Sequence, residues 1–438
     1  MRVDLLAGHG IGAVGALFAA IDGGARLWSP TGLWRSRAVV RMYRWRGILR
    51  VLALSVAAGA LILMVPAAML AVGLLVYETA GFLDVAGAGT AARATGAYAE
   101  LVAFLFRPDG LPTWLPRLAL TLVVFVIVLI AVDAVRSTAT LRARKRHRGG
   151  FWWSSLGAPL GSSGAAVYFR RGLWDLLRGG SAIREPDATD LGRRIAELVT
   201  ENLSQPGFRE LLLVVHDLDA ERDLVFALLG PEARRSFFLR KPVAGDRRSA
   251  EAFDLAGVSR DHTLHVVAGA LALPVLCEPE QIGFPPESYW RGETHRICDR
   301  PGALVRVLEE AATAGARQVL IVTSASETAG PHGLSARHVA PRARVSEFLA
   351  TAQAAAVRDA VLACRPWFDR VFVVRPVHNA IGPLDLAGAF DERSDRFVRL
   401  TELIDRGYED AYRQFIEPVI GASGEALEAQ RRPARADG

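Results

Sequence analysis

Cysteine and lysine are both scarce in this chain of 438 residues. The three cysteines, Cys277, Cys298 and Cys364, show no metal-ligand spacing, which argues against a disulfide framework and favours a reducing compartment. Lysine occurs only at Lys145 and Lys241, so the net charge of +6 comes from arginine. The bias toward Arg, Ala and Gly is typical of a GC-rich bacterial genome. We therefore expect no nucleic-acid partner from the basic charge alone.

Two long apolar runs stand out in a composition that is 51% hydrophobic. Residues 48–77 are interrupted only by Arg50, and as a helix they would extend ~45 Å, against a hydrocarbon core of ~30 Å. This run can cross a membrane with tilt, and Pro66 can kink it. The second run covers residues 118–136. It is compatible with a buried core segment, but its flanks favour a second membrane span.

Arginine clusters flank the two runs, while the connecting segment 78–116 has few basic residues. Positive charge resists translocation, so we expect a two-helix hairpin in the inner membrane of a bacterium, with both termini cytoplasmic. The clusters could also bind anionic headgroups at ~1 kcal/mol per residue, but we interpret them as setting topology. The clusters contain Arg35, Arg37, Arg41, Arg44, Arg46 and Arg50 before the first run and Arg136, Arg142, Arg144, Lys145, Arg146 and Arg148 after the second.

The remainder, residues 150–420, alternates predicted strands and helices. Continuous apolar runs predict strands at 210–215, 317–323 and 370–374 that are covered on both faces. Helical patterns lie at 190–202, 302–314, 345–364 and 395–415. This order predicts an α/β fold, a doubly wound and mostly parallel sheet. We expect residues 1–47 to belong to the same domain, the hairpin to occupy residues 48–136, and residues 421–438 to be a disordered tail.

The N-terminus begins with a strand-like run and then the sharp turn Gly8-His9-Gly10-Ile11-Gly12, followed by an apolar helix. This is the frame of the Gly-x-Ser-x-Gly nucleophile elbow of serine hydrolases. The nucleophile position holds Gly10, which has no side chain and accepts strained backbone angles without penalty. We interpret His9 as a bystander. The segment contains no charged n-region, so we expect no cleavable signal peptide.

Several blocks, in their order along the chain, resemble the patatin-like phospholipase family. Residues 3–16 are similar to its first strand, elbow and helix, and residues 210–226 to its middle strand and turn. Residues 265–286 resemble the helix and Pro-rich loop before its catalytic aspartate. Residues 301–322 resemble its closing helix and strand.

The resemblance implies a lipid acyl hydrolase with a Ser–Asp dyad and an upstream glycine-rich oxyanion loop. In this sequence the serine slot is Gly10 and the acid slot is Arg291, with Asp299 as an alternative acid. The chain starts only seven residues before Gly8, which leaves no room for the oxyanion loop and suggests a late start codon or a truncation. We expect a degenerate, cofactor-free pseudoenzyme that binds membrane lipids or a protein partner. The alternative is an active phospholipase or esterase whose nucleophile lies elsewhere.

Other serines offer weaker candidates for that nucleophile. Ser162 and Ser163 lack a preceding strand, and we interpret them as a flexible linker. Ser324 and Ser326 follow the predicted strand at 317–323, at an edge where α/β folds bind ligands. We interpret both as loop-capping residues.

Two further sequence patterns allow more than one interpretation. His216, Asp217 and Asp219 follow a predicted strand, but without further spaced ligands a turn is favoured over a metal site, and Asp391-Glu392-Arg393 is typical of a solvated helix start. The glycines of residues 10–15 also fit the dinucleotide fingerprint Gly-x-Gly-x-x-Gly. That motif requires a second strand ending in an acidic residue about twenty positions on, and the sequence offers none there.

Overall fold

The computed structural model describes residues 3–85, 91–105, 107, 109, 111–141, 158–203, 205–239, 248–325, 341–377 and 398–419. The chain divides into two compact units. A globular unit contains Met1–Arg44 and Ser162–Gly438, and a helical unit contains Trp45–Gly161.

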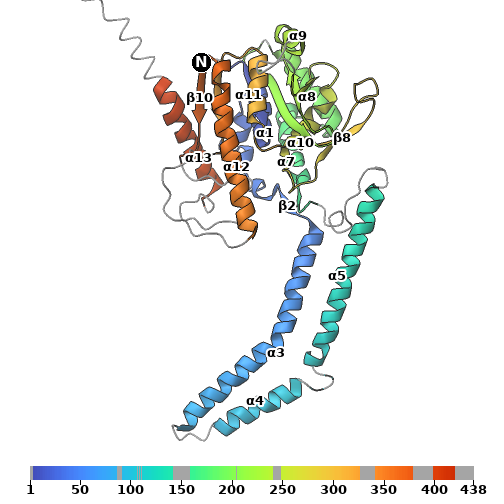
Figure 1. Ribbon diagram of the computed structural model, residues 1–438, viewed down its shortest axis with the longest axis vertical. Coiled ribbons are helices and arrows are strands. Elements are labelled where there is room, and N and C mark those ends of the chain that lie inside the picture. Colours follow the sequence, from blue (N-terminus) through green and yellow to red (C-terminus); the bar gives the residue numbers. More distant parts are fainter. Residues whose placement is uncertain are drawn as a thin grey trace, which may run out of the picture. The chain divides into compact units, whose positions relative to one another are not determined.

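A mixed six-stranded sheet forms the centre of the globular unit (Figure 1). Its strands are β1 (Leu5–His9), β4 (Glu210–Asp217), β5 (Arg222–Leu228), β6 (Glu251–Asp254), β7 (Glu280–Gly283) and β8 (Thr294–Cys298). β1 runs parallel to β4 and β5 runs parallel to β6. β4 is antiparallel to both β5 and β8, and β7 is antiparallel to β8. The prediction of a mostly parallel sheet is therefore wrong for the described strands.

A tight turn after β4 explains the antiparallel pairing of β4 and β5. The Asp217 carboxylate accepts the backbone N–H groups of Asp219 and Ala220, at 2.9 and 3.2 Å, and Glu221 adopts a left-handed φ of 55°. The chain thus reverses directly into β5. A continuous apolar run indicates that both faces of a strand are covered, but it does not set the direction of the neighbouring strand.

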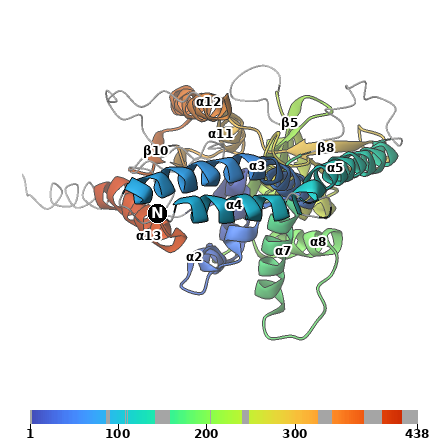
Figure 2. The same cartoon turned by 90° about the horizontal axis from the view of Figure 1, so that it is seen from below.

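Both faces of β4 are indeed covered. Leu211, Leu213 and Val215 belong to one hydrophobic core, and Leu212 and Val214 belong to the other, as expected when successive side chains alternate between faces. The first core includes residues of α1 (Ile11–Asp22), α7 (Ser163–Arg178), α8 (Ala188–Asn202) and α10 (Thr263–Leu271). The second includes residues of α9 (Pro231–Leu239), α11 (Leu304–Thr313) and α12 (Pro341–Cys364). Figure 2 shows α11 and α12 side by side.

The predicted strands at 317–323 and 370–374 are confirmed as β9 (Gln318–Val322) and β10 (Arg370–Val374), but they form a separate parallel pair. The predicted helices at 190–202, 302–314 and 345–364 are confirmed as α8, α11 and α12. The last predicted helix is α13 (Leu400–Ala411), which continues into a π-helical turn at Tyr412–Ile416. Shorter elements are α2 (Ala25–Trp28), β2 (Arg44–Trp45), β3 (Leu160–Gly161) and 3₁₀ turns at Leu33–Arg35, Val39–Arg41, Arg260–His262 and Arg365–Trp367. The predicted tail at 421–438 lies outside the described residues.

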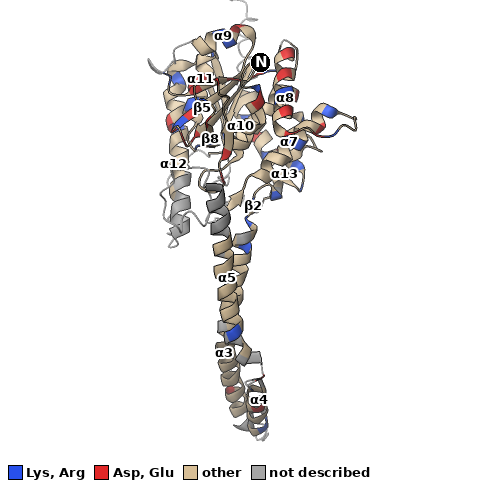
Figure 3. Cartoon of the chain, turned by 90° about the vertical axis from the view of Figure 1, so that its right-hand side faces the viewer, with Lys and Arg blue, Asp and Glu red and all other residues tan. Residues whose placement is uncertain are grey.

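The helical unit contains α3 (Gly47–Val85), α4 (Ala91–Leu105) and α5 (Leu111–Leu141). Figure 3 shows few charged positions along α3 and α5. Among the described residues, one segment is by itself long and apolar enough to cross a membrane, Leu49–Phe82, and none of its most apolar stretch is buried within the protein. The apolar part of α5 is shorter, Arg117–Leu129.

The second half of α3 packs against α4, which occupies part of the segment expected to be a simple connection. The Tyr98 hydroxyl of α4 donates to the carbonyl of Met69. A Cβ on Gly73 would lie 2.9 Å from the Tyr98 ring, so the absence of a side chain at Gly73 permits this close approach.

Candidate functional site

The strand register directs the ends of two strands to the same point in the sheet. β1 and β8 pair with the same edge of β4 but run in opposite directions. β1 ends where His9 pairs with Val214, and β8 ends where Cys298 pairs with His216. The residue that follows each strand therefore arrives beside Val215, the one position of β4 between these two pairs.

Those two residues are Gly10 and Asp299. The Asp299 Oδ1 atom lies 3.0 Å from His9 Nδ1. A Cβ added to Gly10 would lie 2.8 Å from Asp299 Oδ2. The Asp299 carboxylate thus occupies the space beside the missing side chain. His9, interpreted above as a bystander, instead contacts this carboxylate, and its side chain stays 24% exposed.

The backbone at Gly10 forms the sharp strand-to-helix turn that the sequence predicts. Gly10 has φ 54° and ψ −138°, and α1 begins at the next residue. The turn also depends on Gly8, because a Cβ there would lie 2.4 Å from the Gly12 carbonyl oxygen. The first N–H groups of a helix lack intrahelical partners and carry partial positive charge. A carboxylate at Asp299 is therefore favourably placed at the start of α1.

Two backbone carbonyls at the end of α10 and just after it accept hydrogen bonds from residues of the site and from Tyr43. The Asp299 N–H donates to the Ala272 carbonyl at 3.0 Å, and the Tyr43 hydroxyl donates to the Leu271 carbonyl at 2.8 Å. Burial, together with the nearby Cys277 and Asp299, raises the pKa of Tyr43 well above its usual range. Tyr43 is therefore a neutral hydrogen-bond donor here.

The nearby thiols are unsuited to replace the missing nucleophile. Burial raises the pKa of Cys298 to about 11, and the charge of Asp299 adds to this effect. Burial also raises the pKa of Cys277. The reactive species of a cysteine is its thiolate, so at neutral pH both side chains remain protonated and poorly reactive.

Arg291 does not lie at the acid position. It is exposed in the turn between β7 and β8, with a left-handed φ of 47°, and its N–H donates to the Ser288 carbonyl at 3.1 Å. All of β8 separates it from Asp299. The alternative acid of the sequence analysis, Asp299, is the one that reaches the turn, because it directly follows the strand that meets Gly10.

The candidate serines do not contact Asp299 within the described residues. Ser162 and Ser163 are not a linker: Ser162 precedes α7 and Ser163 is its first residue. Ser324 follows β9, which belongs to the separate strand pair, and Ser326 lies outside the described residues. The segment Asp391-Glu392-Arg393 also lies outside them. Between α1 and Arg44 the described chain contains helical turns and no strand, so the second strand of a dinucleotide fold is missing there.

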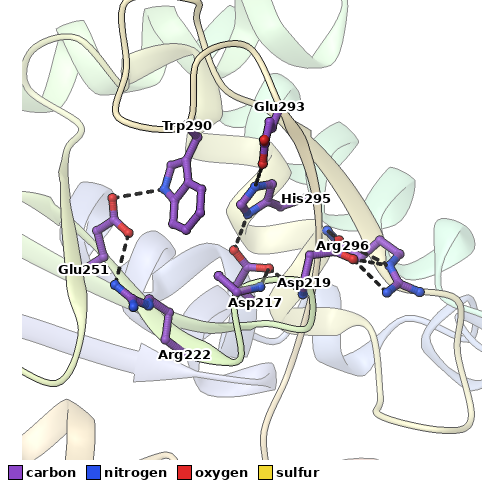
Figure 4. A network of polar contacts seen from close by, with 9 residues as sticks. Asp217, Asp219, Arg222, Glu251, Trp290, Glu293, His295 and Arg296 are labelled. Atoms are coloured by element: carbon purple, nitrogen blue, oxygen red, sulfur yellow. Dashed lines mark hydrogen bonds and ion pairs between the residues drawn. The ribbon is translucent and has the colours of Figure 1, made fainter. Parts of the chain in front are cut away.

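The predicted cluster at the end of β4 separates into three polar pairs. His216 Nδ1 lies 2.9 Å from Asp223. Asp217 Oδ2 lies 2.5 Å from Nδ1 of the buried His295, and Asp219 Oδ1 lies 2.7 Å from Arg296 Nη2 (Figure 4). Among the described residues no group of three His, Cys, Asp or Glu side chains could hold a metal ion. The pairs tie β4 to β5 and β4 with its turn to β8, so they are structural.

An apolar cavity of about 160 Å³ lies between α1, α7 and α10. No sequence pattern indicates this cavity, because most of its wall comes from three helices that are remote in sequence. Arg170, His265 and Glu280 are its ionisable groups, and each is already paired: Arg170 with Glu185 at 2.7 Å and His265 with Glu280 at 3.1 Å. Its apolar lining includes Val14, Leu17, Phe18, Ala166, Leu173 and Val267.

Gly8→Ala tests the turn. The added methyl group meets backbone atoms of Gly12, which cannot move without unwinding the start of α1, so we expect a loss of about 1–3 kcal/mol in stability. The matched control is Gly12→Ala, where a Cβ meets nothing within 4 Å and Ala is the better helix former by up to ~1 kcal/mol. Thermal unfolding of the full chain in detergent measures both. Equal melting temperatures for the two variants would contradict this account.

Asp223 predicts a specific acid sensitivity. Burial alone would raise its pKa, but hydrogen bonds from His216 and Arg300 lower it to about 2. Because the folded-state pKa is depressed, the stabilisation, on the order of 2 kcal/mol, is present above pH ~4 and is lost as the pH falls toward 2. Urea unfolding followed by tryptophan fluorescence should show this loss in the parent chain and a flatter pH dependence in Asp223→Asn. Asp405→Asn, at an exposed ion pair with Arg35, should behave like the parent.

Comparisons with known proteins assign the chain to no family. No protein-family model, no curated protein and no solved structure matches it.

Proposed function

We propose that this chain is a membrane-anchored lipid-binding protein that resembles patatin-like phospholipases at its N-terminal turn and lacks their catalytic nucleophile. The observation that carries this proposal is the apex of the turn. Gly10 has no side chain, and the Asp299 carboxylate lies beside the position that a serine would occupy. This arrangement supports a Ser–Asp dyad from which the hydroxyl group is missing.

The chemistry explains why the missing hydroxyl matters. In a Ser–Asp dyad the carboxylate removes the hydroxyl proton as the serine oxygen attacks the acyl carbon, and backbone N–H groups hold the oxyanion. Loss of a nucleophile typically lowers the rate by many orders of magnitude. A protein with this turn and no hydroxyl keeps the shape of the site and not its covalent step.

Two features support the membrane and lipid assignments. The most apolar stretch of Leu49–Phe82 is not buried within the protein, and with the arginine clusters it favours a hairpin in the bacterial inner membrane with both termini cytoplasmic. The cavity has a mainly apolar lining, and its ionisable side chains already have hydrogen-bond partners. An engineered cavity of about 150 Å³ in another protein stays dry and binds benzene, so this cavity suits a stretch of uncharged acyl chain. The alternative to a lipid ligand is a protein partner that binds this chain.

The His9–Asp299 contact favours one second candidate, hydrolysis without a serine. In that reaction His9 would take a proton from water, the water oxygen would attack the ester carbonyl, and the proton would pass to the departing alkoxide. Esterase activity of the parent chain that is lost in His9→Gln would support this candidate and contradict the pseudoenzyme.

Gly10→Ser tests the leading proposal by restoring the missing group. The new Cβ would meet the end of the Asp299 side chain, which can shift, although serine is strained at φ 54°. We expect a fluorophosphonate probe to label Gly10→Ser and not the parent. Adding Asp299→Asn should slow labelling by roughly 10²-fold, because general-base catalysis typically contributes 10²–10⁴-fold.

The matched control is Gly12→Ser, which adds a hydroxyl to the same turn, away from Asp299, at a position where a Cβ meets nothing within 4 Å. It should remain unlabelled. Labelling of the parent chain at any serine would show that the nucleophile lies elsewhere and would contradict the proposal.

Ala166→Phe tests the cavity. The benzyl group would fill space between α1, α7 and α10, so we expect reduced crosslinking of a photoreactive diacyl phospholipid in nanodiscs. Val258→Phe adds the same group at an exposed position outside the cavity and should leave crosslinking unchanged. Peptide mapping should place the crosslink on α1, α7 or α10, and a crosslink confined to the helical unit would contradict this assignment.

A further inference from the structure

The loop between α10 and β7, residues 272–277, exposes an apolar side chain on a strained backbone. Val275 is 91% exposed and has a φ of 67°. A left-handed conformation is a genuine outlier for a β-branched residue and is strained. Val258 is nearly as exposed, at 87%, but is not among the residues with positive φ. Exposure alone is common among surface valines, and the combination with strain is what distinguishes Val275.

Loop 272–277 lies near two points of the globular unit. At Arg44 the chain leaves this unit, and at Ser162, just before α7, it returns. Tyr43, two residues before the helical unit begins, donates to the Leu271 carbonyl. Where the chain returns, a Cβ on Gly164 would lie 2.6 Å from the Met42 carbonyl oxygen. The Ser162 side chain hydrogen-bonds to Cys277 of the loop. Within the globular unit, the loop therefore lies beside Tyr43 and Ser162, near the residues that precede and follow the helical unit.

The departing segment is strongly basic. Arg37, Arg41 and Arg44 are exposed, and the sequence contains no Asp or Glu between Asp22 and Glu78. An apolar tip beside several cations fits the boundary of an anionic bilayer, where apolar groups enter the acyl region and arginines bind phosphate groups. Acidic groups are present beside the loop as well, at Glu278 and Glu280, so the cations of the departing segment are needed for attraction to such a surface.

We propose that loop 272–277 inserts Val275 into the surface of an anionic membrane, with Arg37, Arg41 and Arg44 binding lipid phosphates beside it. This inference rests on the proposed membrane anchor and goes beyond it, because it assigns the face of the globular unit that meets the lipid. The same loop holds the Asp299 N–H through the Ala272 carbonyl. Insertion therefore places the turn at Gly10 close to the bilayer, so that a ligand reaches it from the membrane rather than from the cytosol.

The test places an environment-sensitive fluorophore at Val275→Cys in the full chain, reconstituted in nanodiscs of phosphatidylcholine with or without phosphatidylglycerol. We expect blue-shifted emission and quenching by doxyl-labelled lipid at this position, both stronger when phosphatidylglycerol is present. Val258→Cys is the matched control and should show neither effect. The unsubstituted chain, whose three cysteines are buried, gives the labelling background. Joint replacement of Arg37, Arg41 and Arg44 by Gln should remove the dependence on phosphatidylglycerol.

Each contrary result has a distinct meaning. Equal quenching at positions 275 and 258, or none at either, overturns the proposal. A blue shift at 275 without lipid quenching shows that protein, such as a second copy of the chain, covers the loop, and this also overturns it. Alkaline carbonate extraction of membranes from cells that express the full chain gives a second readout: release of the chain contradicts the membrane anchor itself, whereas a retained chain with an unquenched label contradicts only the role of the loop.

Discussion

The shared edge of β4 is the constraint on which the candidate site depends. Two strands that run in opposite directions pair with that edge end to end, so the residues following them meet. A glycine at the end of one strand leaves room for a carboxylate at the end of the other. The close contact between positions 10 and 299 is therefore a property of sheet register and does not require any long loop to fold back over the site.

The local features of the N-terminus were predictable because they are set by neighbouring residues. An apolar run, a glycine-rich turn and an apolar helix are all encoded within residues 3–22, and the structure contains them in that order. The strand at 210–215 was predictable for the same reason, since its two covered faces require an uninterrupted apolar run. Its direction relative to β5 was not, because that depends on the turn that Asp217 stabilises, and polar turn residues resemble any other loop in sequence.

The acid of the site shows the same limit at longer range. Motif spacing pointed to Arg291, whereas the residue beside Gly10 is Asp299, eight positions later. β8 is only five residues long and lacks a continuous apolar run, so its end could not be located from periodicity. The cavity was equally hidden, since the small and apolar residues of α1, α7 and α10 have the ordinary spacing of core-facing helices. Only tertiary packing shows that these faces leave a space between them.

The buried pair of Asp217 and His295 has a consequence for the durability of the site. The pair joins the first half of β8 to the end of β4, at the opposite end of β8 from Asp299, and it does not involve Gly10. A one-residue slip of β8 would carry Asp299 out of reach and separate these two buried groups at once. The register of β8 is thus fixed at a distance from Asp299, the residue that this strand positions. A substitution at Gly10 would leave this buried pair intact, so the register of β8 is held independently of the residue at the apex of the turn.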